Sequence, residues 1–280
     1  MLREETVFGP IHSRRLGSSL GINLLPTKGK ICNFDCIYCE CGWNADGRSD
    51  TRIPTAAEVR NALEDKLSAC LLEGTPIDSI TFSGDGEPTL NPEFPRIIDD
   101  TVSLRDAYYP QAKVSVLSNA TRVHLPEIFE AMRKVDNPIL KIDAPTDALA
   151  ALINRPAPGY SVERTVEALR KFDGDFILQT MFLKARQRWL DRTPEDPAAP
   201  GKPLEDPAAA VRPAEYWFDS GSPEVLLPWM DIVRALRPRQ VQVYSIDRPT
   251  PSGDLEKYGA DELRALVQPL VDEGFNILIR

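Results

Sequence analysis

Short apolar segments alternate with amphipathic segments along most of the chain, and this alternation constrains the fold more than any other feature. The apolar segments have the length of strands, and the amphipathic ones repeat their apolar residues at helical spacing. The predicted strands are 21–25, 78–83, 113–118, 138–143, 176–183, 241–245 and 275–279. The predicted helices are 55–74, 92–107, 125–134, 161–172, 223–236 and 260–273. Repeated strand–helix units with short loops specify parallel strands and right-handed crossovers, so the sequence predicts an α/β fold.

The first predicted helix carries clear start and stop signals. Thr55 is a candidate N-cap, and Glu58 three residues later completes a capping box. Gly74 ends the helix. The apolar positions that share one face are Val59, Leu63, Leu67, Cys70 and Leu71.

Residues 187–223 break the alternation. This segment is rich in proline, alanine and acidic residues and has no sustained period, so it indicates an insertion between a strand and its helix. A tolerated surface loop is the simplest interpretation, and the aromatic residues 216–218 suggest a lid that contacts substrate as the alternative. Apart from this insertion, residues 1–280 are predicted to form a single domain.

Composition narrows the class of protein. With 42% hydrophobic and 27% charged residues, the chain has the composition of an ordinary globular protein. No apolar run approaches the roughly 20 residues that cross a bilayer, and the charged N-terminus lacks a signal-peptide core, so we expect a cytoplasmic protein without membrane contact. The net charge of −9 disfavours a nucleic-acid partner unless a local basic patch overrides the repulsion.

Four of the five cysteines fall within residues 32–41. In a reducing compartment, clustered cysteines indicate metal ligands or redox groups. Cys32, Cys36 and Cys39 are spaced so that one loop can wrap three thiolates around a compact inorganic cluster and leave one metal position open. Thiolates suit iron–sulfur clusters or zinc, and a structural zinc site with Cys41 as fourth ligand is the alternative.

The spacing C-x3-C-x-aromatic-C, with Tyr38 as the aromatic residue, resembles the signature of radical S-adenosylmethionine (SAM) enzymes. The resemblance implies that Cys32, Cys36 and Cys39 ligate a [4Fe–4S] cluster, that the open iron binds the amine and carboxylate of SAM, and that Tyr38 lies beside the adenine. It implies a partial parallel (β/α)6-type barrel. The implied activity is reductive cleavage of SAM to a 5′-deoxyadenosyl radical, which abstracts hydrogen from an unidentified substrate. The implied electron donor is ferredoxin or flavodoxin.

The loop after the second predicted strand reads "GDGEPTL" (84–90) and resembles the family's "GGE" motif. Gly84 and Gly86 allow the backbone to approach a ligand closely. The resemblance implies that Glu87 accepts hydrogen bonds from the amine of SAM. The simpler interpretation of these residues is a turn.

Polar residues near the ends of later strands are further candidates for SAM binding. Ser118 and Asn119 could bind ribose hydroxyls or the SAM carboxylate, with an Asn cap as the alternative for Asn119. Lys141 could pair with the SAM carboxylate and Asp143 could orient it or meet substrate, with a salt bridge between the two as the alternative. Gln179 lies in an apolar strand, where its amide needs a partner from a ligand ribose or from neighbouring backbone.

A longer set of motifs resembles one branch of the superfamily, the bacterial Fe–S oxidoreductases related to the wyosine-base synthases of tRNA. The motifs are "FGPIHSRRLGSSLGINLLP", "CNFDCIYC", "TFSGDGEPTL", "SNAT", "KIDAP", "INRPAPG", "LQTMFL" and "YSIDRPTP". The synthases carry a second set of cysteines before the first, and here no cysteine precedes Cys32. We therefore carry over the SAM chemistry and not the tRNA substrate.

Two alternatives compete with this reading. One is a non-enzymatic zinc-binding or Fe–S module. The other is a radical SAM activase of another protein, with residues 187–223 as the docking segment.

Overall fold

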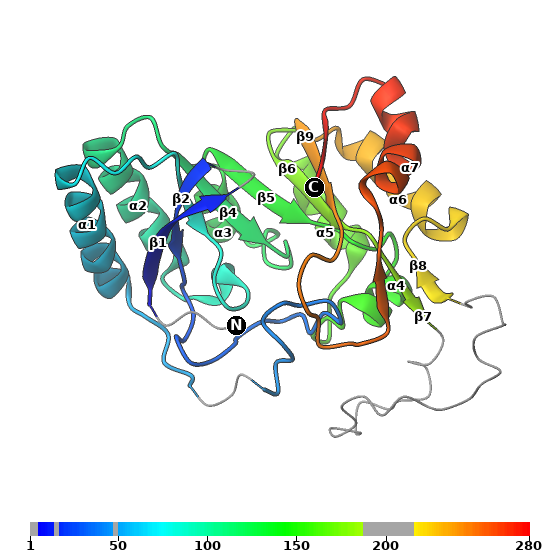
Figure 1. Ribbon diagram of the computed structural model, residues 1–280, viewed down its shortest axis with the longest axis horizontal. Helices are drawn as coiled ribbons and strands as arrows, with labels where there is room; N and C mark the ends of the chain where they lie inside the picture. The colour runs from blue at the N-terminus through cyan, green and yellow to red at the C-terminus, as the bar shows by residue number, and fades with distance from the viewer. Residues whose placement is uncertain (1–4, 14–16, 47–49, 187–215) are drawn as a thin grey trace.

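The computed structural model describes residues 5–13, 17–46, 50–186 and 216–280. Its main feature is an eight-stranded sheet with the order β1-β2-β3-β4-β5-β6-β9-β11 (Figure 1). All neighbouring strands pair in parallel except β1 and β2, which are antiparallel. The predicted α/β fold with parallel strands is therefore confirmed. The strands are β1 (Val7–Ser13), β2 (Gly17–Ile22), β3 (Ser79–Phe82), β4 (Lys113–Ser118), β5 (Asn137–Lys141), β6 (Ile177–Met181), β9 (Gln240–Tyr244) and β11 (Ile277–Ile279).

Helices connect the parallel strands. They are α1 (Ala56–Leu72), α2 (Phe94–Tyr108), α3 (Pro126–Met132), α4 (Asp147–Ile153), α5 (Val162–Arg170), α6 (Pro223–Leu236) and α7 (Ala260–Asp272). In Figure 1, α1 and α2 lie beyond one half of the sheet, and α6 and α7 lie beyond the other half. The capping box of Thr55 and Glu58 is present at the start of α1. No helix among the described residues is long and apolar enough to span a membrane.

The two faces of the sheet differ in polarity. Alternate residues of each strand point to opposite faces. The apolar set packs in the main core together with the helices; it includes Leu20, Ile80, Val114, Leu140, Leu178 and Val241. The residues between them are polar and also buried; they include Ser19, Ser79, Thr81, Ser115, Gln179 and Gln242. The concave side of the sheet is thus lined by groups that can hydrogen-bond a ligand.

The strand predicted over 176–183 is two strands. β6 ends at Met181, and β7 (Leu183–Arg186) belongs to a separate antiparallel sheet with β8 (Tyr216–Asp219) and β10 (Leu255–Lys257). Phe182 lies between the two strands and packs its ring against Trp229, 5.2 Å away between centroids.

The predicted insertion, residues 187–223, is described only from residue 216 onward. Its aromatic residues 216–218 belong to β8, and residues 187–215 lie outside the described part of the chain. The start of α6 at Pro223 agrees with the predicted helix over 223–236.

Candidate functional site

The three cysteines lie in the long loop between β2 and α1, and this loop is attached first to the loop that follows β3. The Ile31 N–H donates to the Asp85 carbonyl oxygen (3.3 Å), and the Glu87 N–H donates to the Ile31 carbonyl oxygen (3.1 Å). Gly86 lies between these bonds with φ of +135°. A Cβ atom there would overlap the Ile31 carbonyl oxygen. Glycine is therefore required where the two loops meet.

Gly84 has a similar role, because a Cβ atom on it would overlap the side chain of Asn23. Asn23 follows β2 and accepts hydrogen bonds from the N–H groups of Leu25 and Asp85. Both glycines of the predicted motif thus allow loops of the protein to approach each other. Their contact with SAM stays a prediction.

Glu87 joins the loops that follow β3 and β4. Its carboxylate is buried and accepts bonds from the Thr89 N–H (3.1 Å), the Thr89 hydroxyl (2.6 Å), the Ser118 hydroxyl (2.8 Å) and the Asn119 N–H (2.7 Å). Burial raises the pKa of Glu87, and these hydrogen bonds oppose the increase. The structure therefore brings Glu87, Ser118 and Asn119 together, as their positions after neighbouring strands predicted.

The other side of the cysteine loop is attached to the segment between α4 and α5. The Asp35 N–H donates to the Asn154 carbonyl oxygen (2.9 Å), and the Ile37 N–H donates to the Ile153 carbonyl oxygen (3.0 Å). In return, the Ala157 N–H donates to the Asn33 carbonyl oxygen (2.7 Å). The cysteine loop is consequently held between elements that follow three different strands.

The side chain of Asn154 reinforces this attachment. Its Nδ2 atom lies 3.5 Å from Cys36 Sγ, 2.7 Å from the Tyr38 hydroxyl and 2.7 Å from Asp143 Oδ2. The Tyr38 hydroxyl also donates to Asp143. One buried network therefore links a cysteine, the aromatic residue of the motif and the carboxylate after β5.

Lys141 completes this network. Its Nζ lies 3.5 Å from Asp143 Oδ1, so the salt bridge that was the alternative interpretation is present. The ammonium also donates to the Tyr244 hydroxyl and lies 4.9 Å from the ring centres of both Tyr38 and Tyr244. Burial opposes the charge, but Asp143 and Tyr244 outweigh it and raise the pKa of Lys141. Lys141 is thus a fixed cation beside the cysteine loop.

Gln179 lies on the strand next to Lys141. The two residues are in register, and Gln179 is in register with Gln242 on β9. The Gln179 amide lies 3.5 Å from the Gln242 side-chain oxygen. Its partner in the structure is therefore another side chain, where the sequence suggested ribose or backbone.

All five cysteines are free thiols, and the four clustered ones are partly exposed. Cys32 Sγ accepts from the Phe34 N–H (3.4 Å) and lies 3.7 Å from Asn119 Nδ2. Burial raises the pKa of Cys32, and it raises the pKa of Cys36 to about 11. A hydrogen bond from Cys41 lowers the pKa of Cys39. The three thiols therefore differ in acidity, and all three would have to lose their protons to ligate a metal.

Lys30 supplies a second buried cation. Its side chain is 1% exposed, and its Nζ donates to the Gly42 carbonyl oxygen (2.6 Å) and lies 3.7 Å from Asp35. Burial opposes its charge, but Cys39, Cys32 and Asp35 outweigh burial and raise the pKa of Lys30. The ammonium group therefore stabilises negative charge on the cysteine loop.

The chemistry of the donor set fits an iron–sulfur cluster. Three thiols come from one loop, N–H groups point at sulfur, and Lys30 and Lys141 offset the charge of thiolates. Within the described ranges, no three His, Cys, Asp or Glu side chains converge on a point where one metal ion could sit. A four-iron cluster is larger than a single ion, so its ligands need not converge on one point. The three cysteines fit such a cluster because thiolates are the donors that it requires.

Sequence reasoning missed three residues of this site: Lys30, Asn154 and Tyr244. Asn154 belongs to the quoted "INRPAPG" motif, which supported the family resemblance but assigned no function to Asn154. Lys30 stands two residues before the first cysteine, and Tyr244 ends β9.

Fold and site together define a parallel α/β protein with a three-cysteine loop at the carboxyl ends of its strands. Residues 27–183 match the Radical SAM superfamily. A UPF0026 protein of Synechocystis sp. is 32% identical over 200 residues, which cover 68% of each chain. The chain therefore belongs to the radical SAM superfamily and to the UPF0026 family. Superfamily membership implies an enzyme that binds a [4Fe–4S] cluster and SAM.

Other relatives are longer than the matched region. A UPF0026 protein of Methanocaldococcus jannaschii is 29% identical over 181 residues, and the chain covers 53% of its length. A Brachyspira hyodysenteriae protein named GTPase Obg is 30% identical over 187 residues, and the chain covers 26% of it.

Solved structures share the fold. A radical SAM methyltransferase from Sphaerobacter thermophilus has a TM-score of 0.62 at 16% identity, covering 94% of this chain and 65% of that one. TYW1 with a bound lysine–pyruvate adduct has a TM-score of 0.58 at 12% identity, covering 92% and 74%. The predicted partial barrel is therefore confirmed.

Proposed function

We propose that this chain is a radical SAM enzyme whose Cys32, Cys36 and Cys39 hold a [4Fe–4S] cluster and whose neighbouring loops hold SAM. The observation that carries the proposal is the attachment of one three-cysteine loop to the residues that follow β3, β4 and β5. When bound, the cluster and SAM supply an electron and a 5′-deoxyadenosyl radical that abstracts hydrogen from substrate.

Different residues of the chain would bind different parts of SAM. Glu87, held by Ser118 and Asn119, supplies a carboxylate for the amine of SAM, and its second oxygen accepts only the Asn119 N–H among the hydrogen bonds described. Lys141 supplies a cation for a carboxylate. Tyr38 presents an aromatic ring beside Lys141, which suits a flat heterocycle.

The polar concave face supports a ligand site inside the partial barrel. Gln179 and Gln242 are buried there with one weak contact between them, so their amide groups can also bond a ribose or a substrate. The helices exclude water from the opposite face, where the apolar core lies.

The branch of the superfamily suggests an electron donor and does not identify the substrate. We infer that the chain belongs to the Fe–S oxidoreductases related to wyosine-base synthases, because the motifs quoted above extend over most of the sequence. We propose ferredoxin or flavodoxin as the donor. We do not extend the proposal to tRNA, because the net charge of −9 opposes binding of nucleic acid.

Anaerobic reconstitution tests the proposal. We expect about four irons and four sulfides per chain and SAM-dependent formation of 5′-deoxyadenosine after reduction with dithionite. The Cys36→Ala variant should lose both. The matched Cys41→Ala variant should keep both, because Cys41 is not one of the three ligands.

The zinc alternative makes the opposite prediction for this pair. A four-thiolate zinc site would bind about one zinc per chain in air and would lose it in Cys41→Ala. That result, together with no 5′-deoxyadenosine from fully reconstituted protein, would refute the proposed function.

A further inference from the structure

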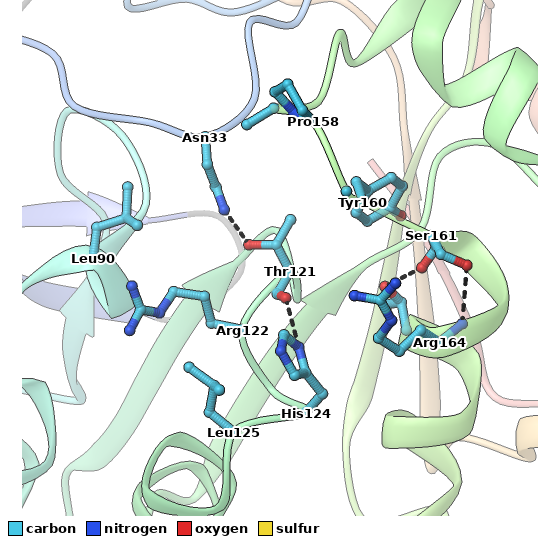
Figure 2. Close-up of a pocket in the computed structure, with 13 residues that line it drawn as sticks. Asn33, Leu90, Thr121, Arg122, His124, Leu125, Pro158, Tyr160, Ser161 and Arg164 are labelled. Atoms are coloured by element: carbon cyan, nitrogen blue, oxygen red, sulfur yellow. Dashed lines mark hydrogen bonds between the residues drawn. The ribbon is translucent and has the colours of Figure 1, made fainter.

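A cavity of about 330 Å³ lies beside the cysteine loop. Its walls come from Asn33 of that loop, from residues 121–125 after β4, and from residues 157–165, which include the start of α5. Figure 2 shows Arg164 with its guanidinium turned toward Thr121 and His124, and Arg122 on the opposite side next to Leu90. The cavity has the size of the smaller small-molecule sites, which span roughly 300–1,000 Å³.

The charge of this cavity differs from that of the whole chain. Two arginines and one histidine line it, and none of its lining residues is acidic, whereas the chain carries a net charge of −9. Within the described residues, neither Arg122 nor Arg164 has an ion-pair partner, and the buried Nε of Arg122 makes no hydrogen bond. A buried donor without a partner costs free energy, so an anion that accepts its hydrogen bond would stabilise this arrangement.

The N-terminus of α5 does not supply the positive charge. The Ser161 hydroxyl accepts the Arg164 N–H (3.3 Å), and the Asp147 carboxylate accepts the Val162 N–H (2.6 Å). The recognition of an anion therefore depends on the side chains of Arg122, His124 and Arg164.

We propose that this cavity binds the phosphate group of a small molecule, with Arg164 and His124 as its main contacts and with Arg122, on the opposite side, as a contact for the rest of the ligand. A guanidinium group matches phosphate oxygens with paired N–H donors, and the imidazole of His124 beside Arg164 can add a further hydrogen bond. The hydroxyl of Tyr160 and the amide of Asn33 line the same space and can bond the rest of the ligand.

The cavity is connected to the cysteine loop. Asn33 donates to the Thr121 hydroxyl (2.6 Å) and accepts from Asn119 (2.7 Å), whose amide lies 3.7 Å from Cys32 Sγ. A ligand in the cavity thus touches a residue that is one side chain away from a proposed cluster ligand. The phosphate site itself does not rest on the proposed function, because its residues bind independently of SAM.

Phosphorus-31 NMR titration of the full reconstituted chain, without SAM, tests the proposal. The probes are inorganic phosphate and ribose 5-phosphate, with ribose followed by proton NMR as the uncharged control. We expect both phosphates to bind and ribose not to bind. Tighter binding of ribose 5-phosphate would assign an organic phosphate, and equal or tighter binding of inorganic phosphate would assign the free ion.

Arginine variants locate the binding. Arg164→Gln should weaken phosphate binding about tenfold or more, because it removes a charge-assisted contact. Arg122→Gln should weaken it less, because the Arg122 guanidinium lies on the opposite side of the cavity. Arg170→Gln is the matched control, since Arg170 is exposed in the last turn of the same helix and does not line the cavity. If Arg122→Gln does not fold, the exposed Arg164 carries the test. Absence of phosphate binding, or binding that Arg164→Gln leaves unchanged, would overturn the proposal.

Discussion

The Asn154 side-chain nitrogen lies 3.5 Å from Cys36 Sγ and 2.7 Å from Asp143 Oδ2. This single amide connects the cysteine loop to the end of β5 from a segment that follows α4. Asn154 is 2% exposed, so its contacts with Cys36, Tyr38 and Asp143 are shielded from water. These contacts depend on the correct placement of all three partners.

Replacing Asn154 should therefore disturb the cluster site. We expect Asn154→Ala to lower the iron content after reconstitution and to destabilise the fold by about 1–3 kcal/mol, because Asp143 loses a buried donor. Iron analysis and thermal unfolding measure the two effects. Asn61→Ala, on the exposed side of α1, is the control and should change neither. Wild-type iron content in Asn154→Ala would show that the amide does not position the loop.

Lys30 should control the reduction potential of the cluster. A buried ammonium favours the reduced, more negative state, so Lys30→Gln should lower the midpoint potential by about 60 mV or more, which is a tenfold change in a one-electron equilibrium. Lys30→Arg keeps the positive charge and should shift the midpoint potential less than Lys30→Gln does. Potentiometric titration followed by EPR gives these values. The control is Lys171→Gln at the exposed end of α5, and an equal shift in it would remove the role assigned to Lys30.

Gly86 should tolerate no side chain. We expect Gly86→Ala to destabilise the protein and to reduce cluster binding strongly, because its Cβ would overlap the Ile31 carbonyl oxygen and its φ is positive. Gly253→Ala has open space around its Cβ and is the matched control. Thermal unfolding and iron analysis of the two variants should separate clearly. Similar values for both would contradict the tight contact between the loops.

Asp136 gives a prediction about pH and stability. Burial alone would raise its pKa, but the Val114 N–H (2.9 Å), Arg105 (2.7 Å) and Lys113 (3.1 Å) outweigh burial and lower it. The folded pKa lies below the unfolded one, so the stabilisation is present above about pH 4 and is lost as the pH falls through the folded pKa.

In urea unfolding at pH 7, Asp136→Asn should have a free energy of unfolding about 1 kcal/mol lower than that of the wild type. The effect is limited because Asp136 is partly exposed to solvent. The difference from wild type should shrink as the pH falls toward 3. Asp175→Asn is the control, because its ion pair with Arg239 is largely exposed. A difference that stays constant with pH would mean that the charge of Asp136 is not the cause.

The sequence predicted the parts of the structure that depend on local pattern. Strand–helix alternation gave the parallel sheet, and the capping box of Thr55 and Glu58 gave the start of α1. The break at Phe182 could not be predicted, because the apolar pattern continues through it and only its packing against Trp229 redirects the chain. The sequence analysis also missed α4 and β1, which joins the sheet only by pairing with β2.

The residues of the candidate site likewise fall into a group that the sequence predicted and a group that it missed. Cysteine spacing and the position of residues after strands predicted Glu87, Ser118, Asn119, Lys141 and Asp143, which the structure places around the cysteine loop. Lys30 carries no pattern of its own, and Asn154 and Tyr244 belong to the quoted motifs "INRPAPG" and "YSIDRPTP", which assigned them no role. They enter the site through contacts between segments distant in sequence, such as the bond from Lys141 to Tyr244 across 103 positions.

The central claim is that three thiolates from one loop hold the cluster and leave a metal position for SAM. EPR spectroscopy of the reduced, reconstituted chain, recorded with and without SAM, tests it most directly. The account predicts that SAM changes the g values of the cluster in the wild type and in Cys41→Ala alike. An identical spectrum with and without SAM, in protein with a full complement of iron, would contradict it.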